Sequence, residues 1–362
     1  MNRREFLGGA AVLATFPWRR LLADDVQSSQ APWRTFETTT RVEVVKPEGI
    51  SRVWLPLPMG GDTDWQRALG NTWNGNAKKM EAVKVGRESA AMLYAEWASG
   101  SESPFVELKS KFTTRDRAVD LSAARASAPQ LSKEEIALYT APTEYIPCDG
   151  LIRETALMRA AKGAQTDLEK GRAIYEWIVQ HTARDPKTKG CGTGNVKAML
   201  ESGNLGGKCA DLSALFVGLA RSVGVAARDV YGIRVAASKY GYKSLGTGSP
   251  NITKAQHCRA EFFARGHGWV PVDPADVRKV MLEEPPGNLP LQDAKVEAAH
   301  KRLFGSWEMN WLALNTAQDV VLPNSKGPKL PFFMYPNGES GGERLDSLEP
   351  DKFKYAITAA EV

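Results

Sequence analysis

The most regular pattern of hydrophobic positions in this chain lies between residues 209 and 224. Apolar side chains recur there at the spacing of one helix face, namely Leu212, Leu215, Phe216, Leu219 and Val223. A repeat of this period predicts an amphipathic helix that begins at Cys209. Gly224 is the residue type that commonly follows a helix end, so we expect the helix to stop just before it.

A second pattern, with a period of two residues, follows the predicted helix. His257–Ala264 and Trp269–Val272 alternate as strands do, and the segment Arg265–Gly268 between them contains two glycines. This arrangement predicts a β-hairpin. Antiparallel pairing places the start of the first strand beside the end of the second, so His257 and Asp273 should lie close together.

The patterning also divides the chain into regions. Residues 33–123 contain β-branched, partly alternating segments and predict a β-sandwich-like domain, with residues 60–76 as a polar loop inside it. Residues 130–282 hold the predicted helices and the hairpin, together with a further strand at Val225–Val235, and form the expected core. Residues 283–362 are expected to be an extension that packs on this core.

The first 23 residues have the features of a twin-arginine export signal. Arg3 and Arg4 precede a weakly apolar run at residues 8–16, which is too short to span a membrane. Cleavage after Ala23 would leave a periplasmic protein without a membrane span. The segment carries four arginines and one glutamate, so the net charge falls from +5 to +2 without it. The charge therefore gives no indication of nucleic-acid binding.

The composition offers little for cofactor chemistry. The chain has four cysteines and four histidines, with no Cys-x-x-Cys, no His-x-x-x-His and no acidic cluster at metal spacing. We therefore predict neither a metal nor another cofactor. Cys148 and Cys191 both lie in loop-like sequence, and a disulfide between them would leave Cys209 free in an oxidising compartment. Four cysteines allow three pairings, so the sequence leaves the pairing open.

Cys209 is at a position where a helix favours a thiolate. The helix dipole and unpaired N–H groups stabilise the ionised sulfur, which is the nucleophilic form. A small buried cysteine without chemistry would fit the same position. His257, at a strand start, is the candidate base. Asp273 would accept its Nδ1–H, with Asp276 as the substitute in the same turn, although Asp273 could instead only cap the turn before Pro274.

Several stretches together resemble the transglutaminase-like superfamily. Gly207–Asp211 and Arg221–Arg228 are similar to the nucleophile helix and the following strand of that family. His257–Glu261 and Gly268–Pro274 are similar to its histidine strand and aspartate turn. The resemblance covers about Ile174–Val280. It implies a papain-like α+β core, in which the nucleophile helix packs on an antiparallel sheet, next to the N-terminal β-rich domain.

The resemblance also implies a catalytic triad. Cys209 would be the nucleophile, His257 the base and acid, and Asp273 the orienter. Members of the family often have an aromatic residue two positions after the histidine, where this chain has Arg259. Arg259 shares a strand face with His257, so it would either line the acyl site and favour a carboxylate-bearing substrate, or pair with Glu261.

Further candidate residues complete the expected site. The candidate substrate-binding residues are Trp269, Asn204 and Arg259. Asn204 and Trp177 are candidates for the side-chain donor of an oxyanion hole, beside the backbone N–H of Cys209. The polar, glycine-rich loop Ser238–Gln256 is expected to border the site, where a loop would hold much of the specificity.

The resemblance implies acyl transfer through a thioester. Attack of Cys209 on a peptide or carboxamide carbonyl releases an amine. Water as the second acceptor gives a peptidase or amidase, which we favour for an exported relative. An amine acceptor gives a protein-cross-linking transglutaminase. A non-catalytic module that binds peptides or proteins in the same cleft is the alternative from a different class.

Overall fold

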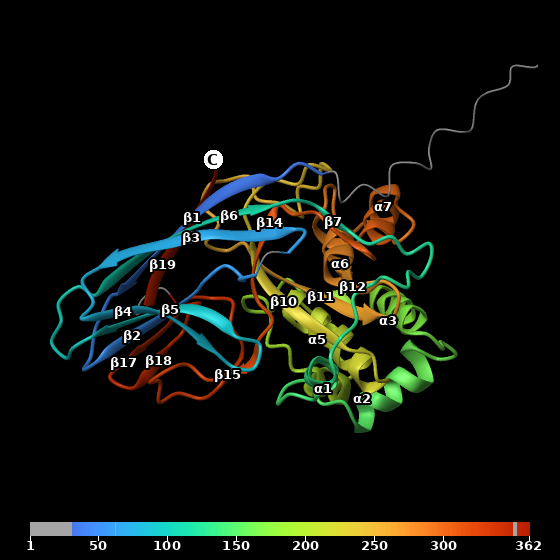
Figure 1. Cartoon of the computed structure of the whole chain (residues 1–362), viewed down its shortest axis with the longest axis horizontal. Coiled ribbons are helices and arrows are strands. Elements are labelled where there is room, and N and C mark those ends of the chain that lie inside the picture. Colours follow the sequence, from blue (N-terminus) through green and yellow to red (C-terminus); the bar gives the residue numbers. More distant parts are fainter. Residues whose placement is uncertain (1–30, 62, 350–352) are drawn as a thin grey trace, which may run out of the picture.

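The computed structural model describes residues 31–61, 63–349 and 353–362. The expected export signal at residues 1–23 lies outside them and stays a prediction. The described chain has two parts side by side: a region of β-sheets, and a region in which helices surround a smaller sheet (Figure 1). Within the described residues, no helix is both long and apolar enough to cross a membrane.

A four-stranded antiparallel sheet forms the centre of the helical part. Its strands, in spatial order, are β12 (Gly268–Val272), β11 (Gln256–Ala264), β10 (Ala227–Arg234) and β14 (Trp311–Asn315). Helix α5 (Cys209–Ser222) packs on β11 and β10, and all of its residues are buried between the sheet and neighbouring helices. The predicted α+β core, with a nucleophile helix on an antiparallel sheet, is confirmed.

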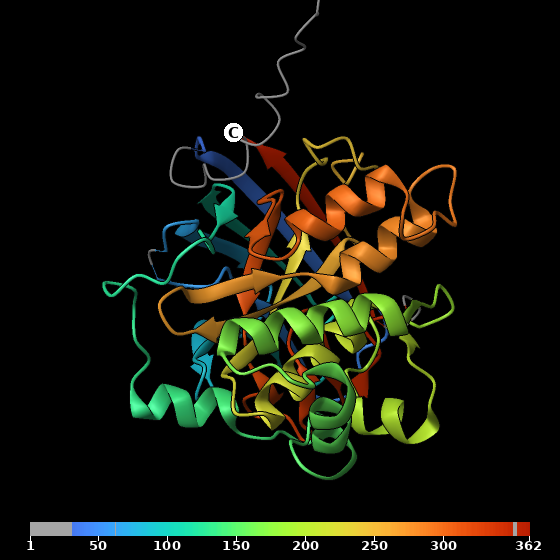
Figure 2. The same cartoon turned by 90° about the vertical axis from the view of Figure 1, so that its right-hand side faces the viewer.

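The other helices of the described chain surround α5 and the sheet. They are α1 (Lys133–Thr140), α2 (Gly150–Thr155) with the π-helical turn Ala156–Ala160, α3 (Asp167–His181), α4 (Val196–Ser202), α6 (Pro274–Glu283) and α7 (Ala294–Arg302). Figure 2 shows α6 and α7, in orange, above the long green helix α3. Gly224 follows the end of α5 with a φ of 80°, a conformation that suits glycine and stops the helix where the sequence predicts.

Two larger sheets form the β-rich part. One contains, in spatial order, β19 (Phe353–Glu361), β1 (Arg34–Val44), β6 (Phe105–Thr114) and β3 (Gln66–Gly75). The other contains β18 (Glu343–Leu345), β17 (Asn337–Ser340), β2 (Ser51–Pro56), β5 (Ala90–Trp97) and β4 (Lys79–Val85). Side chains of both sheets, such as Val42 and Leu93, form one buried cluster. The predicted N-terminal β-rich region is confirmed.

The last strands of the chain join these sheets. β19 pairs antiparallel with β1, and β17 pairs antiparallel with β2. The expected extension, residues 283–362, is thus divided between the two parts, since α7 and β14 stay with the helical part. The β-rich part is therefore built from both ends of the described chain (Figure 1).

Three short strand pairs lie outside these sheets. They are β7 (Arg117–Ala118) with β13 (Ser306–Trp307), β15 (Gln318–Val320) with β16 (Leu330–Phe332), and the parallel pair β8 (Ala183–Arg184) with β9 (Gly206–Gly207). The parallel pair positions the backbone directly before Cys209 beside the end of α3.

The segment 60–76, predicted as a polar loop, contains strand β3. Its backbone pairs with β6 from Gln66 to Gly75, while most of its side chains remain exposed. The strand is held by its backbone at the edge of a sheet, and side chains at such an edge need no hydrophobic pattern.

Candidate active site

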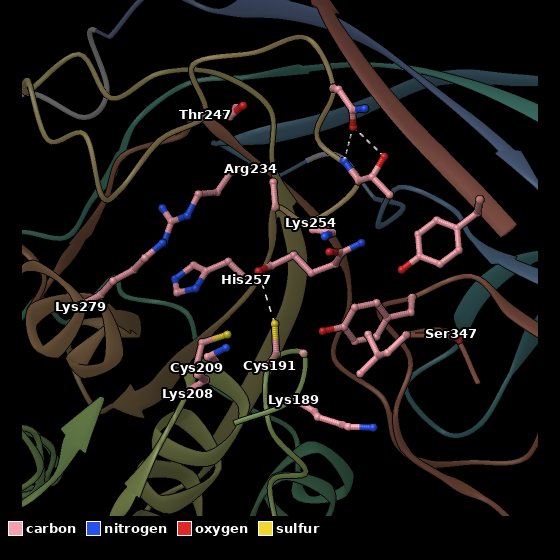
Figure 3. Close-up of a pocket in the computed structure, with 18 of the residues that line it drawn as sticks. Lys189, Cys191, Lys208, Cys209, Arg234, Thr247, Lys254, His257, Lys279 and Ser347 are labelled. Carbon is pink, nitrogen blue, oxygen red and sulfur yellow. Dashed lines mark hydrogen bonds between the residues drawn. The ribbon is translucent and has the colours of Figure 1, made fainter. Parts of the chain in front are cut away.

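Cys209 is the first residue of helix α5, and it is 4% exposed where it lines a cavity. Its N–H belongs to the first helical turn, where N–H groups lack an acceptor one turn earlier. The positive end of the helix dipole therefore acts on the sulfur. In Figure 3 the sulfur of Cys209 lies beneath the ring of His257.

Asp211 joins the start of α5 to the loop before α4. Its Oδ2 accepts the N–H of Lys208 over 3.0 Å. Its Oδ1 accepts the N–H groups of Thr193 and Gly194, each over 3.0 Å. A Cβ at Gly192 would collide with this carboxylate, so only glycine fits there. Asp211 thereby holds the loop against the nucleophile.

His257 and Asp273 form the pair that the hairpin predicts. Nε2 of His257 donates to Oδ2 of Asp273 over 2.8 Å. The predicted donor was Nδ1; in the structure Nε2 makes this contact, and Nδ1 is the ring nitrogen that remains. Oδ1 of Asp273 accepts the N–H of Asp276 over 2.9 Å at the start of α6. Asp273 therefore orients the imidazole and caps a helix at the same time.

Six buried ionisable groups meet here, namely Cys209, Arg234, His257, Arg259, Asp273 and Asp276. Nη2 of Arg234 donates to Oδ1 of Asp276 over 2.6 Å, and this oxygen lies 3.4 Å from Nε2 of His257. Nε of Arg259 lies 3.4 Å from Oδ2 of Asp273. With the imidazole protonated and the thiol ionised, the positive and negative charges balance, which limits the free energy required to bury them.

These charges decide the ionisation of the cysteine and the histidine. Burial and the Arg234 guanidinium lower the pKa of His257, but the carboxylates of Asp276 and Asp273 outweigh them and raise it to about 9. Hydrogen bonds with the two neighbouring cysteine thiols, and then the charge of His257, hold the pKa of Cys209 well below its usual value despite burial. Both shifts favour the thiolate–imidazolium form of the pair.

The cavity in front of this pair has a volume of about 740 Å³. The loop expected to border the site contributes Gly246, Thr247, Asn251, Thr253, Lys254 and Ala255 to its wall. Cationic side chains also line it, namely Arg184, Lys189, Lys208, Arg234, Lys254 and Lys279 (Figure 3). Glu349 is the one carboxylate among the described lining residues. Lys208 and Lys254 form no ion pair within the described chain, so the cavity carries surplus positive charge.

Arg259 lies behind the pair instead of in the cavity. It is 1% exposed and stacks against the rings of Trp307 and Trp311. Neither predicted alternative describes its contacts. It does not line the cavity, and Glu261 pairs with Arg117 and Arg228 instead. The carboxylate that Arg259 contacts is Asp273, so Arg259 acts on the orienter and not on a substrate.

The other sequence candidates also lie outside the cavity lining. The ring of Trp269 packs edge-on against Tyr139, with centroids 5.1 Å apart. Oδ1 of Asn204 accepts the N–H of Gly206 over 3.0 Å within a turn. Trp177 is buried in the main hydrophobic core. Of the expected oxyanion donors, the backbone N–H of the nucleophile is the one that the structure places at the cavity.

The disulfide between Cys148 and Cys191 that the sequence left open is not formed, because both are free thiols. Cys191 lies instead with Cys209 and Cys258, and the three sulfurs are all within 4.8 Å of one another. The backbone explains this position, since the carbonyl of Cys191 accepts the N–H of Ala210 over 2.9 Å.

Several cavity residues escaped the sequence reasoning. Cys191, Arg234 and Tyr335 line the cavity, but they come from segments with no local spacing relative to the nucleophile. Gln256, which directly precedes His257, also lines the cavity, and it ends the loop that was expected to border the site. Nε2 of Gln256 is buried without a hydrogen-bond partner among the described residues.

Comparisons with known proteins agree with this architecture. Residues 155–274 match the sequence profile of the transglutaminase-like superfamily. An uncharacterized protein from Haemophilus influenzae is 34% identical over 337 residues, which cover 88% of this chain and 89% of that protein. The crystal structure of a candidate cysteine protease from Cytophaga hutchinsonii is similar over 91% of this chain and 99% of its own, at 14% identity and a TM-score of 0.51. At this identity the similarity concerns the fold alone.

A cysteine at a helix start, a histidine on the adjacent sheet and an orienting carboxylate define a cysteine-dependent enzyme. Residues 155–274 form a domain of the transglutaminase-like superfamily, as the sequence resemblance predicted.

Proposed function

We propose that this protein is an exported cysteine peptidase or amidase that hydrolyses a peptide or carboxamide bond through a thioester on Cys209. One observation carries the proposal: Cys209 at the start of α5 and His257 line the same cavity, and Nε2 of His257 donates to Oδ2 of Asp273 over 2.8 Å. The cavity of about 740 Å³ in front of this pair lies within the size range of substrate pockets.

Acylation follows from the ionisation of the pair. The Cys209 thiolate attacks the carbonyl carbon, and the C–S bond forms as the carbonyl oxygen takes up the negative charge. The N–H of Cys209 and the dipole of α5 stabilise this oxyanion. Nδ1–H of His257 then protonates the leaving amine as the C–N bond breaks. Asp273 keeps the ring oriented during both steps.

Deacylation needs a second acceptor. After acylation His257 is neutral, so its Nδ1 takes a proton from water as the water oxygen attacks the thioester carbon and a C–O bond forms. The C–S bond then breaks, the carboxylic acid product leaves, and Cys209 departs as the thiolate, which restores the thiolate–imidazolium pair. The positive charge of the cavity favours water over a lysine amine, because Lys208 and Lys254 repel a protonated acceptor. This observation favours hydrolysis over protein cross-linking.

The same charge indicates the substrate class. The cavity is lined by cationic side chains from several elements, and Lys208 and Lys254 lack an ion pair within the described residues. A substrate with a carboxylate near the bond that breaks would supply the missing negative charge. The sequence suggested an acidic substrate through Arg259; the proposal now rests on the lysines, because Arg259 is buried behind the triad.

The proposed location is the periplasm. Arg3 and Arg4 before a short apolar run are the feature that supports export. Fractionation of cells that express the full chain tests this point. Replacement of both arginines by lysine should retain the protein in the cytoplasm, and unchanged periplasmic recovery of that variant would reject twin-arginine export.

The rate of iodoacetamide labelling at Cys209 as a function of pH, followed by peptide mass, tests the enzyme proposal. We expect an inflection well below the value of about 8.5 for a free cysteine. His257→Ala should move the inflection upward, because the imidazolium no longer stabilises the thiolate. His300→Ala is the matched control, since His300 binds Glu176 outside the cavity.

Turnover then separates an enzyme from a binding module. Peptides with an acidic residue are screened for cleavage by the wild type and by Cys209→Ala. Cleavage that Cys209→Ala abolishes supports the proposal. A normal labelling inflection, or cleavage that persists in Cys209→Ala, contradicts it.

A further inference from the structure

Three thiols gather at the nucleophile from different parts of the chain. Cys209 starts helix α5, Cys258 lies in strand β11, and Cys191 lies in the loop before α4. Their sulfurs are all within 4.8 Å of one another. The hydrolytic mechanism needs one sulfur, so the other two require a separate explanation.

The two extra thiols differ in their access to the cavity. Cys191 lines the cavity together with Cys209, whereas Cys258 does not. Cys258 is fully buried, and its sulfur lies 3.7 Å from Sδ of Met334. A small reagent in the cavity therefore meets Cys209 and Cys191.

The position of Cys191 beside the nucleophile is held by the backbone. Its carbonyl accepts the N–H of Ala210, the residue after the nucleophile, over 2.9 Å. Its Sγ–H donates to the carbonyl of Gln256 over 3.4 Å, and its sulfur lies within 4.8 Å of the Cys209 sulfur. A disulfide requires the two sulfurs to approach to about 2.05 Å, which side-chain rotation from this starting distance makes accessible.

We propose that Cys191 is a resolving thiol for Cys209, so that a peroxide converts the pair into a reversible disulfide that closes the active site. The Cys209 thiolate is the form that reacts with peroxides. The inference goes beyond hydrolysis and requires only a reactive sulfur at position 209. It also assigns Cys191 a function that a bond to Cys148 would prevent.

The reaction balances with H2O2 as the oxidant. The Cys209 thiolate attacks one oxygen, an S–O bond forms, the O–O bond breaks, and the released hydroxide takes up a proton as water. The sulfur is thereby oxidised by two electrons to a sulfenic acid. The Cys191 sulfur then attacks the sulfenic sulfur. The S–S bond forms, the S–O bond breaks, and oxygen leaves as a second water with the proton of the Cys191 thiol.

Non-reducing peptide mapping tests the proposal. The full chain is reduced, desalted and treated with a small excess of H2O2, then digested with its free thiols blocked. We expect a linked peptide pair that contains Cys191 and Cys209, together with loss of iodoacetamide labelling at Cys209. Dithiothreitol should restore this labelling almost completely. A link from Cys209 to Cys148 or Cys258 instead would overturn the assignment.

Cys191→Ser and Cys191→Ala provide the decisive comparison, each measured against its own reduced labelling rate. Without a resolving thiol, Cys209 should advance to sulfinic acid, so most of the recovery with dithiothreitol is lost. Cys148→Ser is the matched control and should recover like the wild type, since the sulfur of Cys148 is not among the three clustered sulfurs. Equal recovery in wild type and both Cys191 variants rejects the proposal, whatever substrate the enzyme cleaves.

Discussion

The two carboxylate oxygens of Asp273 have different hydrogen-bond partners, namely the ring of His257 and the first turn of helix α6. Oδ2 accepts from Nε2 of His257 over 2.8 Å, and Oδ1 accepts the N–H of Asp276 over 2.9 Å. The same side chain therefore fixes the imidazole and starts the helix that follows the hairpin. A substitution that keeps one of these contacts and removes the other separates the chemical role from the structural one.

Asp273→Asn makes this separation. Asparagine is as good a helix N-cap as aspartate, so α6 should keep its start and the protein should fold, while the loss of one charge from the buried network lowers the melting temperature. The amide lacks the charge that orients and stabilises the imidazolium, so kcat should fall by roughly 10³- to 10⁴-fold, as for the equivalent change in a triad protease. Asp293→Asn, at the cap of α7, is the control and should leave kcat unchanged. Retention of more than a tenth of the wild-type kcat in Asp273→Asn would remove Asp273 from the triad.

The pH dependence of labelling and of turnover should differ. Labelling needs only the Cys209 thiolate, so its rate should rise through a low inflection and then stay level. Turnover also needs the imidazolium as an acid. The pKa of His257 is raised to about 9, so kcat/KM should fall as the pH rises through about 9. Parallel profiles of kcat/KM and iodoacetamide labelling over pH 4–11 test this, and a turnover rate that stays level above pH 10 would show that His257 is not the acid.

The charge of the cavity can be measured without a substrate. Iodoacetate carries a carboxylate that iodoacetamide lacks, and both alkylate Cys209. Replacement of Lys208 and Lys254 by glutamine should lower the ratio of the iodoacetate rate to the iodoacetamide rate about two- to fivefold, the size of an exposed charge pair. The effect should shrink in high salt. Lys197→Gln, on the exposed face of α4, is the control. An unchanged ratio would argue against an acidic substrate.

The sequence was informative where local chemistry and local pattern coincide. The apolar stripe that begins at Leu212 predicted that Cys209 starts a helix, and the hairpin predicted that His257 lies beside Asp273. The structure shows both. Both relationships involve neighbouring elements, so a periodicity and a turn are sufficient to predict them. Strand β3 was not predicted, because most of its side chains are exposed and its pairing with β6 uses backbone atoms.

The residues that complete the site depend on contacts between distant segments. Arg259 was expected to pair with Glu261 or to contact a substrate. In the structure Arg117 of strand β7 forms the ion pair with Glu261, and Arg259 contacts Asp273 instead. The sequence left the partner of Cys191 open, because no local signal shows that Asp211 holds its loop against the nucleophile. These contacts join segments that are far apart in the chain, and no local pattern in a single sequence predicts them.

Helix α3 packs closely against strand β11, which carries His257, and this contact leads to a prediction about stability. A Cβ at Gly171 would collide with the ring of Phe262 on β11. Alanine normally favours a helix over glycine by about 1 kcal/mol, but the overpacking should dominate, so Gly171→Ala should lower the free energy of unfolding by about 1–3 kcal/mol. Urea denaturation measures this change. The control is Phe262→Leu, which makes room. In that background Gly171→Ala should no longer destabilise the fold, and equal losses in both backgrounds would show that this contact does not set the packing.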